Sequence, residues 1–213
     1  MMTDFTLSLA AMDILRQQLG IEASAYPFEI PHNGVTPEQR VGIRMAVFAD
    51  LERRGLAHRG KLSAEIEDAL TAMAKWDAAI AMVGIEEGSS CARALVVSAG
   101  TRVYRIVQDN QLLRFDRPAS VVRGTVDLLP DVKAGQGRSV TFTADSESAD
   151  ALTAGTYLKR PRRRLGQLSV VDRLELTWFD TDVGRYISYA QDGWLTYAPA
   201  DKNRIAALLQ AAI

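Results

Sequence analysis

The chain is poor in the residue types that metal sites, disulfide frameworks and many catalytic centres need. Its 213 residues include one cysteine, Cys91, and two histidines, His32 and His58. One cysteine excludes an internal disulfide framework, and so few cysteines and histidines argue against a zinc site. We expect Cys91 to be an inert buried thiol on a strand, and both histidines to lie in surface loops. No metal or cofactor is therefore expected.

Strong net charge and long apolar runs are also missing. The chain carries 25 basic and 26 acidic residues, for a net charge of −1, so no global field favours nucleic acid or an anionic membrane. No apolar run approaches the length that a membrane-spanning helix needs. Residues 1–20 carry charge at Asp4, Asp13 and Arg16 and lack the apolar region of a signal peptide. We therefore expect a cytoplasmic protein without membrane insertion.

Sequence motifs for catalysis are hard to find. No Gly-x-Ser-x-Gly motif is present, and Gly135-Gln-Gly137 lacks the lysine and the helix start of a phosphate-binding loop. Asp180 and Asp182, with Glu175 nearby, could bind a metal if they shared one face of a strand. They precede Gly184, however, and aspartates often close turns through their own backbone. We expect a structural role and assign no catalytic residue, with a metal-assisted hydrolase as the open alternative.

The basic run at residues 159–164 is the strongest local charge feature. It reads Lys-Arg-Pro-Arg-Arg-Arg, and acidic Asp145, Glu147 and Asp150 lie just upstream. A solvated loop, a charged rim facing a protein partner and a phosphate-binding surface all fit this pattern. Nucleic-acid readers usually add stacking aromatics or a wider basic face. Binding of nucleic acid or an anionic ligand through residues 159–164 is therefore kept as the alternative function.

Spacing and capping residues predict three helices in the N-terminal part. Thr36-Pro37-Glu38-Gln39 is the strongest start, because threonine caps, proline suits the first turn and Gln39 completes a capping box. The residues Val41, Met45, Phe48, Ala49 and Glu52 trace a mostly apolar face on that helix. The predicted helices span residues 8–19, 36–54 and 63–75, with caps at Ser8, Thr36 and Ser63 and a connector at 21–34.

From Trp76 onward the apolar period changes from helical to the alternation of strands. A helix opened by Pro118 and stopped near Pro130 follows the first group of strands, and a helix opened by Pro199 ends the second group. Another helix is expected at residues 145–154, started by Asp145 or Ser146 and ended by Gly155. The predicted strands span residues 76–84, 91–99, 102–108, 111–115, 139–143, 165–171, 174–180, 185–190 and 194–198.

The order of elements repeats although the sequence does not. Several strands and then a helix occur at residues 76–130 and again at 138–213, after a helical segment at 1–75. An antiparallel sheet flanked by helices is the economical packing for that order. We expect a single α+β domain, residues 1–213, whose central, mostly antiparallel sheet has pseudo-twofold βββα-like halves.

The final meander is crowded with aromatic residues. Trp178 and Phe179 are adjacent on a strand and should face opposite sides of the sheet. Both faces therefore carry large apolar groups. Either helices cover both faces, or part of one face is a docking surface for another molecule.

This meander also carries a resemblance. The segments Trp178-Phe-Asp-Thr-Asp-Val-Gly-Arg-Tyr186, Asp192-Gly-Trp194 and Ala198-Pro-Ala-Asp201 resemble the C-terminal block of the EspG family. The likeness extends over nearly the whole chain and includes Leu51-Glu-Arg-Arg-Gly-Leu56 and Gly60-Lys-Leu-Ser63. Members of that family are cytosolic chaperones of the type VII (ESX) secretion systems of actinobacteria.

The resemblance implies a non-enzymatic role. A chaperone of this family binds the apolar tip of a PE–PPE heterodimer, keeps the pair soluble and delivers it for export. The family's contacts involve the central sheet, a loop between its early strands and the C-terminal region, and that loop is here a short joint at Ser98–Thr101. Whether the chain is a monomer or a weak homodimer is left open. The implied partner-binding residues are Ser98, Gly100, Thr101, Arg102, Tyr104, Trp178, Tyr186, Tyr189 and Trp194.

Overall fold

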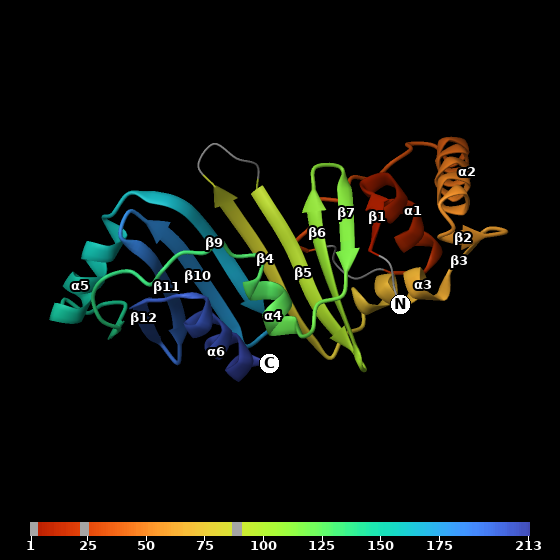
Figure 1. Cartoon of the computed structure of the whole chain (residues 1–213). Coiled ribbons are helices and arrows are strands. Elements are labelled where there is room, and N and C mark those ends of the chain that lie inside the picture. Colours follow the sequence, from red (N-terminus) through yellow and green to blue (C-terminus); the bar gives the residue numbers. More distant parts are fainter. Residues whose placement is uncertain (1–3, 22–25, 87–90) are drawn as a thin grey trace.

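The computed structural model describes residues 4–21, 26–86 and 91–213. Within these ranges, one sheet of 10 strands runs through the whole molecule in the order β1-β7-β6-β5-β4-β9-β10-β11-β12-β8 (Figure 1). All of its strand pairs are antiparallel. The α+β architecture expected from the sequence, a mostly antiparallel sheet flanked by helices, is therefore confirmed.

The elements follow the predicted order, with three strands that were not predicted: β1 at the start, and β2 and β3 in the link after the second helix. The strands of the large sheet are β1 Phe5–Ser8, β4 Ala78–Glu86, β5 Cys91–Ala99, β6 Arg102–Asp109, β7 Leu112–Asp116, β8 Val140–Thr143, β9 Arg162–Val170, β10 Leu174–Thr181, β11 Gly184–Gln191 and β12 Trp194–Pro199. The helices are α1 Leu9–Gln18, α2 Pro37–Arg53, α3 Ala64–Ala72, α4 Val121–Val126, α5 Ala149–Leu158 and α6 Lys202–Ala212, and β2 Ala57–His58 with β3 Lys61–Leu62 makes a small hairpin.

The sheet is built from two meanders that meet at the β4–β9 seam, where Ile80 pairs with Val170. One meander runs outward through β5, β6 and β7, and the other through β10, β11 and β12. Each is followed by a helix, α4 or α6, and Figure 1 shows both helices in front of the sheet. This arrangement has the expected pseudo-twofold character. The pairing of β1 with β7 also ties the N-terminal segment into the same sheet.

Each face of the sheet has its own apolar core. The face under α4 and α6, called here the front face, buries Ile80, Leu168, Leu176, Ile187 and Ile205 among others. The opposite, rear face is covered by α1 and α3 at one end of the sheet and by α5 at the other. Helices therefore cover much of both faces, which explains why both faces of the meander carry large apolar groups.

Helix α2 begins where the sequence predicts, but it packs through different residues. Thr36 caps it and Gln39 completes the capping box. The buried side chains are Val47 and Leu51, whereas Val41 and Met45 of the expected apolar face are 51% and 68% exposed. The buried side chains of the helix lie in its C-terminal half, whereas its first half is attached through polar contacts of Arg40 with Asp13 and Gln17. Amphipathic spacing at Val41 and Met45 therefore did not indicate burial.

Helix α4 is shorter than predicted. It does not open at Pro118 but starts after Ser120, whose hydroxyl accepts a hydrogen bond from the Arg123 amide. Pro118 instead packs against the helix, because a Cβ on Gly124 would lie 2.6 Å from its Cγ atom. The proline therefore limits the helix that it was expected to begin.

Helix α5 lies later in the chain than predicted. Its cap is Ser148, which accepts a hydrogen bond from the Ala151 amide, and Gly155 lies inside the helix instead of ending it. The basic run is also only partly a loop, since β9 starts at Arg162. The last helix, α6, does not open at Pro199, which is the final residue of β12. Its cap is Asp201.

Candidate functional site

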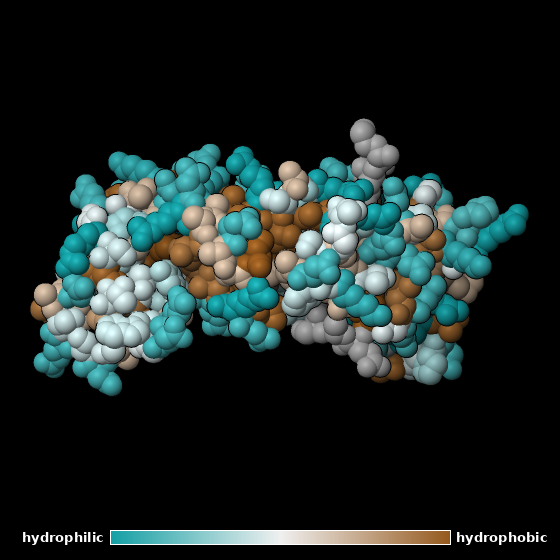
Figure 2. Space-filling view, turned by 90° about the horizontal axis from the view of Figure 1, so that it is seen from below, coloured by the Kyte–Doolittle hydropathy of each residue, from teal (hydrophilic) through white to brown (hydrophobic). Residues whose placement is uncertain are grey.

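A run of turns lies along one edge of the molecule, called here the rim. It contains the start of β4, the turns β5–β6, β9–β10 and β11–β12, and the C-terminal end of α6. In Figure 1 these segments lie along the lower edge, and Figure 2 views the molecule from that side. The rim therefore brings together the predicted joint at Ser98–Thr101 and the predicted residue Trp194.

The β5–β6 joint is held from outside by Asp77. The Asp77 amide donates to the Ser98 carbonyl at 2.8 Å, and its carboxylate accepts from the Gly100 amide at 2.7 Å. Gly100 has a φ of 59°, which suits a two-residue hairpin turn. Arg102 forms an ion pair with Asp68 of α3. Asp77 and Asp68 therefore connect the joint to neighbouring elements.

An apolar patch occupies the middle of the rim. Trp76 and Val171 are 38% and 47% exposed, and together with Ala212 and Ile213 they line a hollow of about 80 Å³. Arg173 donates to the carbonyls of Ala212 and Ile213 at 3.3 and 3.0 Å. Figure 2 shows a continuous apolar area across the middle of this side. We call Trp76, Val171 and Ile213 the rim patch.

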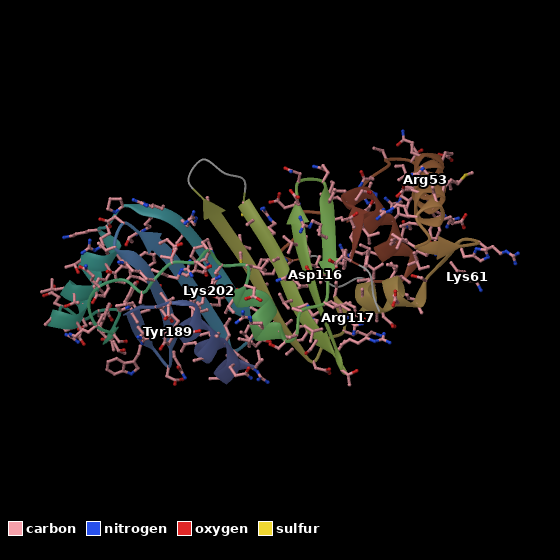
Figure 3. The ribbon with its side chains drawn as sticks, viewed as in Figure 1. Arg53, Lys61, Asp116, Arg117, Tyr189 and Lys202 are labelled. Carbon is pink, nitrogen blue, oxygen red and sulfur yellow. The ribbon has the colours of Figure 1, made fainter. Side chains whose placement is uncertain are left out.

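The outer part of the rim carries Trp194 at the β11–β12 turn. Its side chain is 51% exposed. Tyr189, across the same turn, is half-buried and packs against the front-face core. Figure 3 shows Tyr189 in the C-terminal half and Arg117 in the N-terminal half, both toward the rim. The rim thus presents aromatic and apolar groups from both halves of the sheet.

The segment that carried the resemblance is buried. Trp178 is 3% exposed, and a Cβ on Gly166 would lie 2.6 Å from its ring. Arg185 is fully buried and donates from Nε to Asp180 Oδ1 at 2.6 Å and from Nη2 to Asp180 Oδ2 at 3.0 Å. Among the described residues Nη1 of Arg185 has no acceptor, but the guanidinium carbon lies 5.1 Å from the Trp178 ring centroid.

The same segment binds the connector between the two sheet halves. Nη2 of Arg185 donates to the Pro130 carbonyl at 3.0 Å. The Arg185 amide donates to the Lys133 carbonyl at 2.8 Å, and the Arg185 carbonyl accepts from the Gly135 amide at 2.9 Å. A Cβ on Gly184 would lie 2.7 Å from the Lys133 carbonyl oxygen. The Gly-Arg-Tyr sequence at 184–186 therefore fits the backbone of residues 130–135.

The predicted partner-binding residues do not all reach the surface. Gly100, Thr101, Arg102 and Trp194 are exposed, and Ser98 and Tyr189 are half-buried. The side chains of Tyr104, Trp178 and Tyr186 are buried, at 1%, 3% and 0% exposure. The Tyr186 hydroxyl donates to the Gln136 carbonyl at 2.9 Å, another contact with the connector. These three side chains help to hold the fold and offer no contact surface in this structure.

Sequence reasoning missed the rim patch. Trp76 was placed in a strand, Val171 at a strand end and Ile213 in a helix, and nothing in local spacing brings them together. Their meeting depends on the β4–β9 pairing, which joins residues far apart in the chain. The one local signal was an aromatic residue, Trp76, two positions before β4.

The residues considered for metal binding or catalysis lie far apart or already bind other side chains. Asp180 is bound by Arg185 on the front face, whereas Glu175 lies in the opposite register of the same strand and faces the rear. Asp182 lies 3.8 Å from Arg160. Among residues 4–21, 26–86 and 91–213, no group of three or more His, Cys, Asp or Glu could hold a metal. Cys91, expected to be buried, is half-buried at the start of β5.

A solved structure has a fold similar to that of this chain. The structure of the Mycobacterium tuberculosis type VII secretion system chaperone EspG5, in complex with a PE25–PPE41 dimer, matches with a TM-score of 0.72 at 13% identity. The match covers 99% of this chain and 95% of the other. It shows that the two chains share a fold.

Sequence comparisons give the family. No curated protein matches the chain. Within the described ranges, no helix is long and apolar enough to cross a membrane. The family model for EspG matches residues 8–211, which is nearly the whole sequence. The chain therefore belongs to the EspG family, a family of chaperones and not of enzymes.

Proposed function

We propose that this protein is a cytosolic chaperone that binds the apolar tip of a PE–PPE heterodimer through the rim. It would keep the pair soluble and deliver it to a type VII secretion system. The observation that carries the proposal is the rim patch, in which Trp76 and Val171 are exposed and Ile213 is half-buried, beside the Ser98–Thr101 joint. EspG5, which shares the fold, was solved with a PE25–PPE41 dimer.

The physical basis is the reversible covering of apolar surface. An exported helical protein with an exposed apolar tip tends to aggregate in water, and covering that tip removes the tendency. The rim patch supplies apolar contact area, while the backbone groups and polar side chains of the neighbouring turns can form hydrogen bonds that fix the partner's orientation. Partner-contact roles are therefore proposed for Ser98, Gly100, Thr101, Arg102, Tyr189 and Trp194, together with the rim patch.

The basic run supports the alternative function less well. Arg162 donates to the Leu158 carbonyl at 3.2 Å, and its guanidinium carbon lies 5.6 Å from the Phe179 ring centroid. Arg160 and Arg164 lie near Asp182 and Asp180. Most of these arginines therefore already have partners within the chain. Salt-sensitive binding of an oligonucleotide, lost when Arg162 and Arg163 are neutralised, would revive the alternative.

The proposed function can be tested by co-expression with PE–PPE pairs encoded near the gene for this chain. A chaperone should keep such a pair soluble and elute with it on gel filtration. Val171→Asp should abolish co-elution, because it places a charge in the centre of the rim patch. Leu152→Asp is the matched control, since Leu152 is 71% exposed on α5, away from the rim.

Two results would contradict the proposal. If no neighbouring pair co-elutes with the wild-type chain, the chaperone function fails. If Leu152→Asp abolishes co-elution while Val171→Asp does not, the contact surface is at α5 and not at the rim.

A further inference from the structure

The β5–β6 joint is fixed by a residue that belongs to neither of its strands. Asp77 uses its amide and its carboxylate to bind both sides of the turn, at Ser98 and Gly100. Trp76 directly precedes Asp77, and Ala78 then begins β4. One residue therefore fixes both the joint and the backbone that carries Trp76 into the rim patch.

Arg173 has a similar position at the other side of the rim patch. It lies in the β9–β10 turn, two residues after Val171, and donates to the carbonyls of Ala212 and Ile213. The last carbonyls of a helix have no partner within the helix, and a cationic side chain there is also favoured by the helix dipole. Arg173 therefore holds the end of α6 against the turn that carries Val171.

Neither residue contributes to the apolar core. Asp77 and Arg173 are both exposed, and their contacts join surface segments. Exposed polar contacts of this kind contribute little to global stability. Their effect on the shape of a binding surface can be larger, because ordering that is present before binding need not be acquired during binding.

We infer that Asp77 and Arg173 are positioning residues that hold the rim in its binding shape before the partner arrives. Asp77 fixes the joint and Trp76, and Arg173 fixes the end of α6 beside Val171. The inference rests on the proposed function for the consequence in binding. The fixing itself is a property of the free protein and is tested without a partner.

The first experiment measures amide hydrogen exchange in the free protein by NMR. The Gly100 amide should be protected in the wild type and should exchange at least about tenfold faster in Asp77→Ala, which removes its acceptor. Asp77→Asn keeps a side-chain oxygen and should keep the protection. Asp50→Ala is the control, because Asp50 is an aspartate of α2 that pairs with Arg53 and Arg54 away from the rim. An unprotected Gly100 amide in the wild type would overturn the inference.

The second experiment measures the dissociation constant for a co-purified PE–PPE pair. Asp77→Ala and Arg173→Ala should each weaken binding about tenfold, with melting temperatures close to that of the wild type. Asp77→Asn should bind like the wild type, as should Asp50→Ala. This combination of results separates positioning of the rim from general destabilisation.

The outcomes distinguish the two proposals. A wild-type chain that binds no pair removes the proposed function, and with it any role of the two residues in binding. A wild-type chain that binds, together with Asp77→Ala and Arg173→Ala variants of equal affinity, overturns only the positioning role. Weaker binding together with a clearly lower melting temperature in both variants would also overturn it, because general destabilisation would then explain the loss of binding.

Discussion

The buried segment Trp178–Tyr186 and the exposed rim differ in what their sequences reveal. The segment supplied the clearest sequence resemblance, yet it lies inside the protein and binds the connector at residues 130–136. The rim patch of Trp76, Val171 and Ile213 has no sequence signature, although Asp192-Gly-Trp194, elsewhere on the rim, is part of the resemblance. The comparison teaches that a family motif can mark how a chain folds, while the proposed contact surface is assembled from residues far apart in the sequence.

The physical reason lies in the two environments. A buried arginine needs an anion, acceptors and a ring at fixed positions, so neighbouring residues must be of specific types. An exposed apolar patch needs only apolar area at the right place. Many residues can supply that area, so the sequence around Trp76 or Val171 need not follow a pattern.

The sharpest test of this comparison is removal of the buried ion pair. Arg185→Ala removes both short hydrogen bonds to the buried Asp180 and leaves it only Arg164 at 3.9 Å, which should cost about 3 kcal/mol in the free energy of unfolding. Urea denaturation measures this cost. Arg163→Ala, in an exposed position of β9, should change stability by less than about 0.5 kcal/mol. Equal effects of the two substitutions would contradict a structural role for Arg185.

Two tryptophans give a matched comparison between the interior and the rim. Trp178→Ala should cost about 3 to 5 kcal/mol, because it leaves a cavity beside Gly84 and Gly166. Trp194→Ala should cost less than about 1 kcal/mol, since its side chain is 51% exposed. Thermal or urea unfolding of both variants checks the difference. A large cost at Trp194 would mean that this part of the rim belongs to the scaffold.

Two glycines sharpen the comparison further. Gly166→Ala places a Cβ against the Trp178 ring and should destabilise the protein by about 1 to 3 kcal/mol. Gly155→Ala, inside α5 with no atom within 4 Å of the added Cβ, should instead stabilise it by about 0.5 to 1 kcal/mol. The two changes in unfolding free energy should have opposite signs. A Gly166→Ala variant that is as stable as the wild type would show that the Trp178 ring can move aside.

The smallest expected effect concerns Asp13, a polar anchor of the N-terminal helices. Burial acts to raise its pKa, but hydrogen bonds from the Asn33 amide and Arg40 outweigh burial and lower the pKa below 3.8. A lowered pKa means that Asp13 stabilises the folded state at neutral pH and loses this contribution as pH falls through its folded pKa. Asp13→Asn should therefore flatten the fall in stability below about pH 4.5.

Urea unfolding at neutral and acidic pH tests this expectation. A variant that keeps the full acid sensitivity of the wild type would show that Asp13 is not an acid-labile anchor.

Local chemistry predicted much of the fold. The capping box at Thr36–Gln39, the joint at Ala99–Gly100 and the final meander each depend on neighbouring residues, and each is found as expected. Where two local signals competed, the sequence was less informative. The cap of α5 is Ser148 and not Asp145 or Ser146, and the helix extends to Leu158, with Ala154 and Tyr157 buried in the apolar core of that end.

The candidate site was less predictable because it depends on contacts between distant segments. The joint at Ser98–Thr101 and Trp194 were placed at the surface correctly. Asp77, Val171 and Ile213 acquire their relation to that joint only through the β4–β9 seam. The resemblance implied contact roles for Tyr104 and Tyr186, but both side chains are buried in the cores of the rear face.

The edge position of β1 has a consequence for synthesis. Phe5 pairs with Phe115 and Leu7 with Leu113, so β1 leaves the ribosome long before β7, the strand with which it pairs. Until β7 emerges, Phe5 and Leu7 have no sheet to join. The nascent chain therefore exposes an unpaired apolar strand for a short time. In this respect it resembles the clients that the protein is proposed to bind, which also expose apolar surface.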